Sequence, residues 1–220
     1  ESKLDEMLSG VMGDEVGRIS FRAAFPRMQV RVSLSGSDSE QLERRLDALE
    51  EAIRERLGDA VYAMGDEGLE ETVIRLLRER GHTIAVAESC TGGLIGHRLT
   101  DVPGSSASFL MGVVAYANEA KEAVLGVRPE TLAAHGAVSV ETAREMAAGV
   151  RRIAGAALGV ATTGIAGPGG GTEEKPVGTV CIGVAWEGGG WAKRYNLGTR
   201  SRSWVKQATA QLALDLVRRW

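Results

Sequence analysis

The fold of this chain is decided by the stretch Ala85-Val86-Ala87-Glu88-Ser89-Cys90-Thr91-Gly92-Gly93. A short apolar run ends in polar residues and two glycines, and the helical spacing of Leu94, Ile95 and Leu99 follows. This order predicts a strand, a tight turn and the start of a helix. Polar groups at the carboxyl end of a strand lie where open α/β sheets bind ligands, and a helix start favours an anion. The stretch therefore predicts a ligand site.

The composition is that of an ordinary globular protein. The 220 residues are 44% hydrophobic and 25% charged, and the net charge of −3 gives no indication of a polyanion partner. The apolar runs are far shorter than the roughly 20 residues of a membrane span, and we see no secretory signal. Cys90 and Cys181 do not suggest a disulfide framework. We expect a soluble, cytoplasmic protein, without a membrane partner, whose start at Glu1 is compatible with a fragment.

Residues 1–65 have the pattern of a small α+β domain. A short helix is expected over 2–9, and two alternating runs, 19–23 and 28–34, predict a hairpin with one buried face. Leucines and an isoleucine at helical spacing over 42–57 predict a long amphipathic helix, which Gly58 ends. The polar break before that helix holds several N-cap candidates.

This small domain resembles a KH module, which raises the question of RNA binding. Gly10-Val11-Met12-Gly13 fits a GxxG loop, but the loop carries no Lys or Arg. Residues 1–65 hold 9 basic and 13 acidic side chains, a net charge of −4 that repels phosphates. We therefore do not expect nucleic-acid binding, and interpret the module as a spacer or a dimerisation element.

A hinge at Met64-Gly65-Asp66 separates this module from a larger domain, residues 66–220. Strands are expected over 83–87, 110–116, 158–162, 179–186 and 191–197, and helices over 69–81, 91–100, from 118, from 139, and over 203–218. The loop 164–178 holds six glycines and is longer than a connection needs. The alternation predicts an α/β fold: a three-layer mixed sheet with helices on both faces, preceded by the small α+β (KH-like) domain.

Six motifs in this order carry a resemblance to a known family. They are Glu88–Gly93, Pro103–Ala107, Tyr116–Lys121, His135–Ser139, Thr163–Pro168 and Glu173–Gly178. Together they resemble the CinA C-terminal family over roughly residues 66–220, and members of that family include nicotinamide mononucleotide (NMN) deamidases. Full-length CinA proteins are similar in placing a KH-like module before this domain, and a molybdopterin-binding-like domain before both. The resemblance implies hydrolysis of the NMN carboxamide, without a cofactor, in pyridine nucleotide salvage.

Amide hydrolysis needs a nucleophile, a proton shuttle and a stabiliser for the oxyanion. The three histidines, His82, His97 and His135, lie at positions that favour structural roles, so a Ser–His–Asp triad is poorly supported. No paired Cys or His spacing predicts a zinc site, and we expect no metal. Lysine replaces histidine as a base when burial or a nearby cation lowers its pKa.

Tyr116 and Lys121 are five residues apart across an expected strand-to-helix turn that can aim both at one point. From the pattern alone, an interior tyrosine and a surface lysine are the ordinary interpretation. The resemblance implies instead that a serine nucleophile is assisted by this lysine and this tyrosine. Ser106, in a glycine-led turn, is the favoured nucleophile, and Ser89 is the competing one. If Ser106 attacks, Ser89 binds substrate or orients another side chain.

The remaining candidate residues are expected to bind NMN or to support the site around it. Glu88 orients Lys121 or caps local N–H groups, and Cys90 is interpreted as a small buried thiol. The N–H groups near Thr91, Gly92 and Gly93 are expected to hold the phosphate. The other candidates are Asn118 as a helix cap, Thr163, Gly164 and Ala166 as the opposite wall, Glu173 and Lys175 on the flexible loop, and either Arg200 or Arg202 near the last strand.

Two functions from different classes fit these observations. One is an NMN amidohydrolase, which we expect to act as a homo-oligomer (dimer). The alternative is a non-catalytic nucleotide-binding regulator of the competence/damage-inducible type, which keeps the pocket but has no turnover. The Ser, Tyr and Lys motif residues favour the enzyme, and ammonia release from NMN separates the two.

Overall fold

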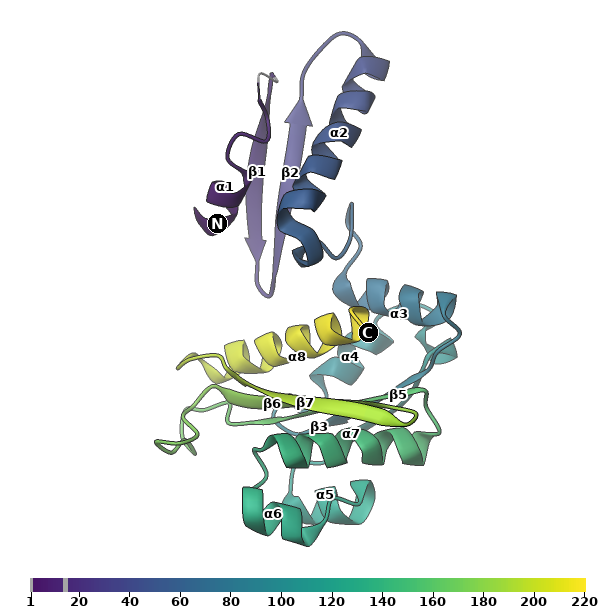
Figure 1. The fold of residues 1–220 in the computed structure, drawn as a ribbon, viewed down its shortest axis with the longest axis vertical. Helices are drawn as coiled ribbons and strands as arrows, with labels where there is room; N and C mark the ends of the chain where they lie inside the picture. Colours follow the sequence, from purple (N-terminus) through teal and green to yellow (C-terminus); the bar gives the residue numbers. More distant parts are fainter. Residues whose placement is uncertain (1, 14–15) are drawn as a thin grey trace. The chain divides into compact units, whose positions relative to one another are not determined.

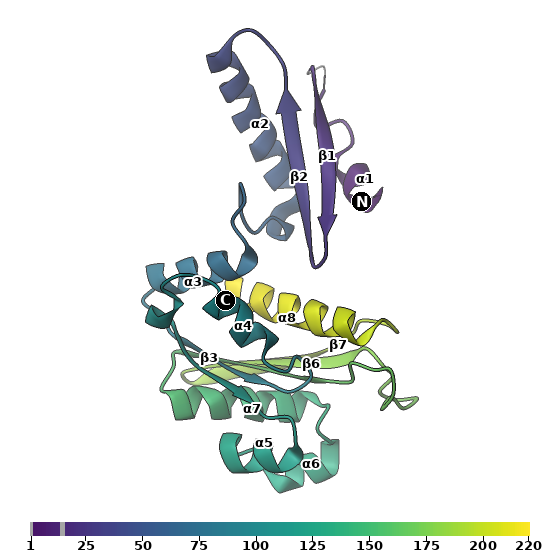
Figure 2. The same cartoon turned by 180° about the vertical axis from the view of Figure 1, so that it is seen from behind.

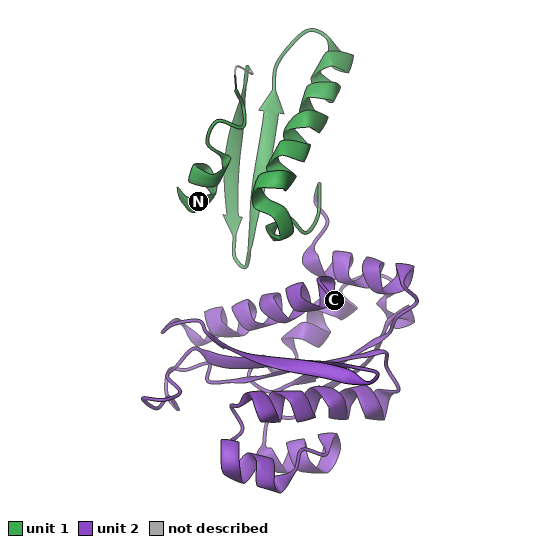
Figure 3. Cartoon of the chain, in the orientation of Figure 1, with its two compact units in different colours: residues 1–65 green, residues 66–220 purple. Residues whose placement is uncertain are grey.

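The computed structural model describes residues 2–13 and 16–220, and these form two compact units, residues 1–65 and 66–220 (Figures 1 and 3). The first unit contains α1 (Ser2–Leu8), β1 (Gly17–Ala24), β2 (Arg27–Leu34), α2 (Ser39–Leu57) and the 3₁₀ turn η1 (Gly58–Ala60). β1 and β2 pair antiparallel in an eight-residue register, and this confirms the expected hairpin.

One long helix supplies much of the core of the first unit. The side chain of Asp38 caps α2 by accepting a hydrogen bond of 3.1 Å from the N–H of Gln41, and Gly58 ends the helix with a φ of 52°. Leu49 and Ile53, one turn apart on α2, are buried. The helical spacing of apolar residues in the sequence therefore corresponds to the buried face.

The second unit is a mixed α/β domain, which confirms the expected fold class. Its elements are α3 (Leu69–Glu79), β3 (Ile84–Glu88), α4 (Leu94–Thr100), η2 (Ser105–Ala107), β4 (Phe109–Val114), α5 (Asn118–Leu125), α6 (Pro129–His135), α7 (Val140–Ala154), β5 (Leu158–Gly164), β6 (Thr179–Trp186), β7 (Gly189–Asn196) and α8 (Arg202–Arg218).

The five strands form one sheet in the order β4-β3-β5-β6-β7. β3 runs parallel to both β4 and β5, whereas β6 and β7 are antiparallel additions. Helix α7 covers one face, with α5 and α6 beyond it, and α3, α4 and α8 lie on the other (Figures 1 and 2). Because both faces of the sheet are covered, strands β3, β5 and β6 are buried along nearly their whole length.

Three local predictions differ from the structure. Helix α4 begins at Leu94 rather than at 91, because Gly92 and Gly93 both have positive φ (62° and 92°) and form a turn instead. Helix α6 was not expected, since its seven residues are too few for a clear apolar period. Asn118 is not the cap of α5: the N-cap is Ala117, without a side-chain hydrogen bond, and Asn118 is the first helical residue.

Candidate active site

The parallel strands bring most of the predicted site residues to one edge of the sheet. Glu88 pairs in register with Val114 on β4 and with Thr162 on β5, so the segments that follow these strands leave from the same end. The motifs Glu88–Gly93, Tyr116–Lys121 and Thr163–Pro168 lie at the ends of these strands or directly after them. The carboxyl ends of parallel strands are the usual ligand-binding edge of such a sheet.

Lys121 is the buried cation of this edge. Only 1% of the residue is exposed, and its Nζ donates hydrogen bonds of 3.0, 3.0 and 3.4 Å to the carbonyl oxygens of Ala115, Tyr116 and Ala117. Helix α5 therefore turns its lysine back onto the chain that leaves β4. No carboxylate forms an ion pair with this ammonium among residues 2–13 and 16–220.

Burial lowers the pKa of Lys121 from its ordinary value near 10.5, while the charges of Cys90 and Glu119 act in the opposite direction. Burial also raises the pKa of the Cys90 thiol to about 12. Cys90 is consequently a neutral thiol at pH 7, so its negative charge is absent there and does not support the ammonium form. The site thus favours an uncharged lysine more than an exposed position would.

The side chain of Tyr116 reaches the start of α8. Its ring is well exposed (61% of the residue), and its phenolic oxygen accepts a hydrogen bond of 2.7 Å from Nη2 of Arg202. Nη1 of the same guanidinium donates to the carbonyl oxygen of Gly167 at 2.9 Å. Arg202 therefore joins the segment after β4 to the glycine-rich loop after β5. Because the phenolic oxygen accepts from Arg202, its own hydrogen remains free to donate to a ligand.

The two candidate arginines make different contacts. Arg202 reaches Tyr116, whereas the guanidinium carbon of Arg200 stacks over the ring of Trp204 at 5.6 Å. Arg202 is accordingly the arginine at the site edge. The sequence could not make this choice because Arg200 lies in the loop before α8 and Arg202 is its first residue, where helical or strand spacing gives little direction.

Glu88 caps helix α4. Its carboxylate is buried and accepts hydrogen bonds from the N–H groups of Ile95 (3.1 Å) and Gly96 (2.8 Å). The N–H of Gly92 donates to the carbonyl of Ser89. A carboxylate thus already occupies two of the N–H donors at the start of α4, and its charge repels a phosphate at this place. Of the two roles expected for Glu88, the structure has the cap.

Lys206 is a further candidate for the site, which the sequence analysis did not name. A Cβ added to Gly92 would lie 3.4 Å from its Nζ, so the ammonium sits over the turn that follows Ser89. Among the described residues no hydrogen bond or ion pair of this ammonium is found. The sequence feature that could have identified Lys206 is its spacing from Arg202. It follows Arg202 by four residues on one helix, which places both cations on the same face of α8.

The glycine-rich loop 164–178 is tied down at both ends. Thr163 Oγ1 donates to the carbonyl oxygen of Ala137 at 2.8 Å, and Lys175 Nζ donates to that of His135 at 2.7 Å. Gly164 packs closely on β6, where an added Cβ would lie 2.7 Å from a methyl group of Val180. Glu173 is exposed on the same loop, and Ala166 is buried. Thr163, Gly164, Ala166 and Lys175 thus help to hold the loop in place.

Thr91 has a structural contact of its own. Its hydroxyl lies 2.7 Å from that of Thr162 on β5, and both residues are buried. The side chain therefore fastens the turn after β3 to the centre of the sheet, while Gly93 provides the left-handed conformation that starts α4.

The two candidate serines lie at opposite ends of the sheet. Ser89 follows β3 directly, at the edge that carries Lys121, and is 8% exposed. Ser106 lies in η2 before β4 and is exposed. The six residues of β4 span about 17 Å, so one chain does not bring Ser106 to Tyr116 or Lys121.

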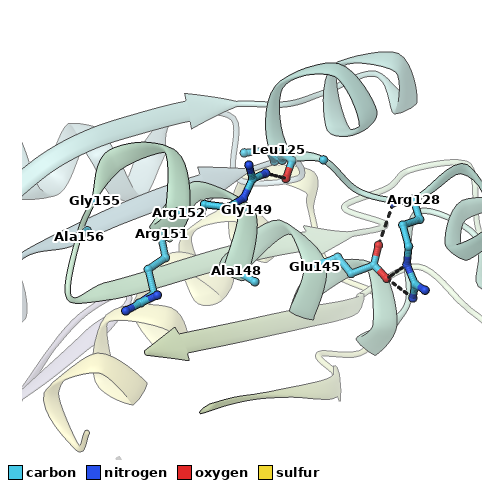
Figure 4. Close-up of a pocket in the computed structure, with 10 residues that line it drawn as sticks. Leu125, Arg128, Glu145, Ala148, Gly149, Arg151, Arg152, Gly155 and Ala156 are labelled. Atoms are coloured by element: carbon cyan, nitrogen blue, oxygen red, sulfur yellow. Dashed lines mark hydrogen bonds and ion pairs between the residues drawn. The ribbon is translucent and has the colours of Figure 1, made fainter. Parts of the chain in front are cut away.

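A different surface hollow lies away from these residues. It has a volume of about 640 Å³ between α7 and the segment after α5, and no predicted site residue lines it (Figure 4). Arg128 is ion-paired with Glu145 at 2.6 Å, and Arg152 donates to the carbonyl of Leu125. The polar groups of this hollow are thus largely satisfied by one another. Among residues 2–13 and 16–220 no cluster of three or more His, Cys, Asp or Glu is placed to hold a metal, and no helix is long and apolar enough to cross a membrane.

Comparisons with known proteins cover the whole chain. Residues 66–220 match the family described as "CinA C-terminal domain", and residues 1–63 match "Damage-inducible protein CinA KH domain". A "Putative competence-damage inducible protein" of Caldanaerobacter subterraneus is 47% identical over 100% of this chain and 53% of its own length. A "CinA-like protein" of Geobacter sulfurreducens is 46% identical with the same coverage. The chain therefore spans about half the length of these curated relatives.

A solved structure agrees with the sequence matches. The competence/damage inducible protein CihA from Agrobacterium tumefaciens superposes with a TM-score of 0.66 at 43% identity, over 67% of this chain and 90% of that one.

Proposed function

Because this chain belongs to the CinA family, we propose that residues 66–220 hydrolyse the carboxamide of NMN to nicotinic acid mononucleotide and ammonia. The observation that carries the proposal is Lys121: a buried lysine, held by three main-chain carbonyls at the ligand-binding edge of the sheet, whose pKa burial lowers. A lysine in such a position serves as a general base.

The proposed reaction has two steps. Neutral Lys121 takes the proton of a serine hydroxyl while the serine oxygen attacks the carboxamide carbon, and the proton passes to the departing ammonia. Water then attacks the resulting ester, and the serine regains its proton as the acid leaves. Tyr116 supports the oxyanion, since its hydrogen is free to donate while Arg202 donates to its oxygen.

The phosphate of NMN is assigned to the cations of α8. Lys206 stands over Gly92 without a partner in the described part of the chain, and Arg202 lies one helical turn before it. We favour this place over the start of α4, because the negative carboxylate of Glu88 already accepts from the N–H groups of Ile95 and Gly96 there. Glu173 and Asn118, both exposed, remain candidates for contacts with the ribose or the pyridine ring.

Ser106 remains the proposed nucleophile, with Ser89 as a substrate-binding or positioning residue. A nucleophile must be accessible to substrate, and Ser106 is exposed whereas Ser89 is 8% exposed. Ser89 has the advantage of lying at the same edge as Lys121. The proposal therefore needs a route by which Ser106 reaches that edge.

The test is release of ammonia from NMN by the purified chain, followed with wild type and Ser106→Ala. Wild type should release one ammonia per nicotinic acid mononucleotide formed, and loss of the nucleophile should lower kcat by several orders of magnitude while NMN still binds. NMN binding without any turnover by wild type would contradict the proposal and favour a nucleotide-binding regulator.

A further inference from the structure

The edge strand β4 is open along one side. It pairs with β3, and no other described strand lies beside it. Its neighbour-free side therefore presents main-chain N–H and C=O groups that another strand can pair with.

This edge lacks the charges and prolines that usually protect an open strand. Residues 109–117 contain no charged residue and no proline. Leu110, Val114 and Tyr116 are exposed to 46%, 53% and 61%. One residue, Leu110, is skipped where β4 pairs with β3, but the strand is regular from Met111 to Val114. An apolar, uncharged edge of this kind indicates a strand that is covered in the working protein.

The positions of the motif residues identify what covers it. Tyr116 and Lys121 follow the carboxyl end of β4, whereas Ser106 precedes its amino end. A two-fold axis through the middle of β4 exchanges these two ends. In an antiparallel pair centred there, Phe109 of one copy lies opposite Val114 of the other, and Met111 lies opposite Gly112.

The same axis places the start of β4 in one copy beside the end of β4 in the other, so the η2 turn that carries Ser106 approaches the segment after β4 that carries Tyr116 and Ala117. Paired Cα atoms within the two β4 strands are about 5 Å apart, so the segments that flank the paired strands leave them close to one another. The carbonyls of Tyr116 and Ala117 are two of the three that hold Lys121. A peptide of another protein could also add to this edge, but only a second copy of this chain supplies the missing serine.

We propose that two copies of this chain pair antiparallel through β4 and that each active site combines Ser106 of one copy with Tyr116 and Lys121 of the other. This inference rests on the proposed function for its chemistry. The closed pair satisfies the open edge of both copies at once, as a two-fold interface requires.

Heterodimers purified through two different tags test the shared site. In the first, one full-length copy carries Ser106→Ala and the other Lys121→Ala. In the second, one copy carries both substitutions and the other is wild type. Shared sites give about half of the wild-type activity in the first heterodimer and nearly none in the second, because only the first keeps an intact Ser106–Lys121 pair. Sites within one chain give the reverse result, which would overturn the proposal.

Sedimentation of the full chain tests the pairing without relying on turnover. Val114→Asp, which brings charge to the edge, should shift the dimer to monomer and abolish hydrolysis. Val124→Asp, on exposed α5, is the matched control and should leave the dimer intact. A Val114→Asp variant that stays dimeric would overturn the pairing. A third outcome is that wild type is dimeric, Val114→Asp is monomeric, and neither hydrolyses NMN. This outcome would support the pairing and contradict the proposed function alone.

Discussion

Arg202 donates a hydrogen bond of 2.7 Å to the phenolic oxygen of Tyr116, which is 86 residues away in the chain. The bond connects the first turn of α8 with the segment after β4, and the second arm of the guanidinium reaches the carbonyl of Gly167. One side chain thus fixes three segments around the proposed oxyanion donor.

We expect Arg202→Ala to lower kcat/KM for NMN by about 10- to 150-fold, because hydrogen bonds to charged groups contribute about 1.5–3 kcal/mol. Arg200→Ala is the matched control, since Arg200 stacks on Trp204, and it should stay within about twofold. Steady-state kinetics of ammonia release measure both. Equal losses in the two variants would show that positive charge in general, and not the Tyr116 contact, matters.

Lys121 should make hydrolysis rise with pH. Its pKa is lowered by burial, so the neutral amine forms at a pH below that of an exposed lysine, and the rate should reach a plateau above that pKa. The same shift affects stability, because folding disfavours the protonated form of Lys121. Between the lowered pKa of the folded chain and about 10.5, the unfolded chain binds more protons than the folded chain. The free energy of unfolding of wild type should therefore rise toward that pH relative to Lys121→Met. Urea unfolding of both proteins between pH 7 and about 10.5 checks the sign.

Much of the scaffold was predictable because it depends on local patterns. Helix α7 begins directly after Ser139, where a helix was expected, and the Ser139 hydroxyl caps it by accepting from the N–H of Thr142 at 3.1 Å. The strands β5 and β6 followed from their apolar runs. The cap of α5 was not predictable, because asparagine fits both the cap and the first turn.

The site itself was predictable only in part. Lys121, Tyr116, Glu88 and Ser89 do lie at one edge, as parallel strands require. What the sequence could not show is direction: that Tyr116 turns to Arg202 and that Lys121 turns back to the main chain. Directions of this kind depend on sheet topology and tertiary packing rather than on local spacing.

Glu88→Ala should destabilise the protein by about 1–3 kcal/mol, because two N–H groups at the start of α4, one buried and one partly buried, lose their acceptor. Glu130→Ala is a suitable control, since Glu130 is exposed in the first turn of α6, and it should change the free energy of unfolding by no more than about 0.5 kcal/mol. Urea denaturation measures both variants. A Glu88→Ala protein as stable as wild type would mean that other acceptors replace the carboxylate.

Iodoacetamide at pH 7.5 should leave the folded protein unmodified. Cys90 and Cys181 are buried, and burial raises the pKa of Cys90 to about 12 and that of Cys181 to about 11, so little thiolate is present. Mass spectrometry should find no adduct on the native chain and two adducts after unfolding in urea. Rapid native labelling of Cys90 with loss of NMN hydrolysis would return attention to a cysteine nucleophile.

The strand order also has a consequence for synthesis on the ribosome. After β3 and β4 have paired, each later strand adds on the opposite side of β3, in the order β5, β6, β7. The β4 border is thus complete while about two thirds of the domain is still untranslated. Because domains begin to fold from the N-terminus during translation, neighbouring nascent chains on one messenger RNA carry this border before either chain is finished, so assembly can begin on the polysome.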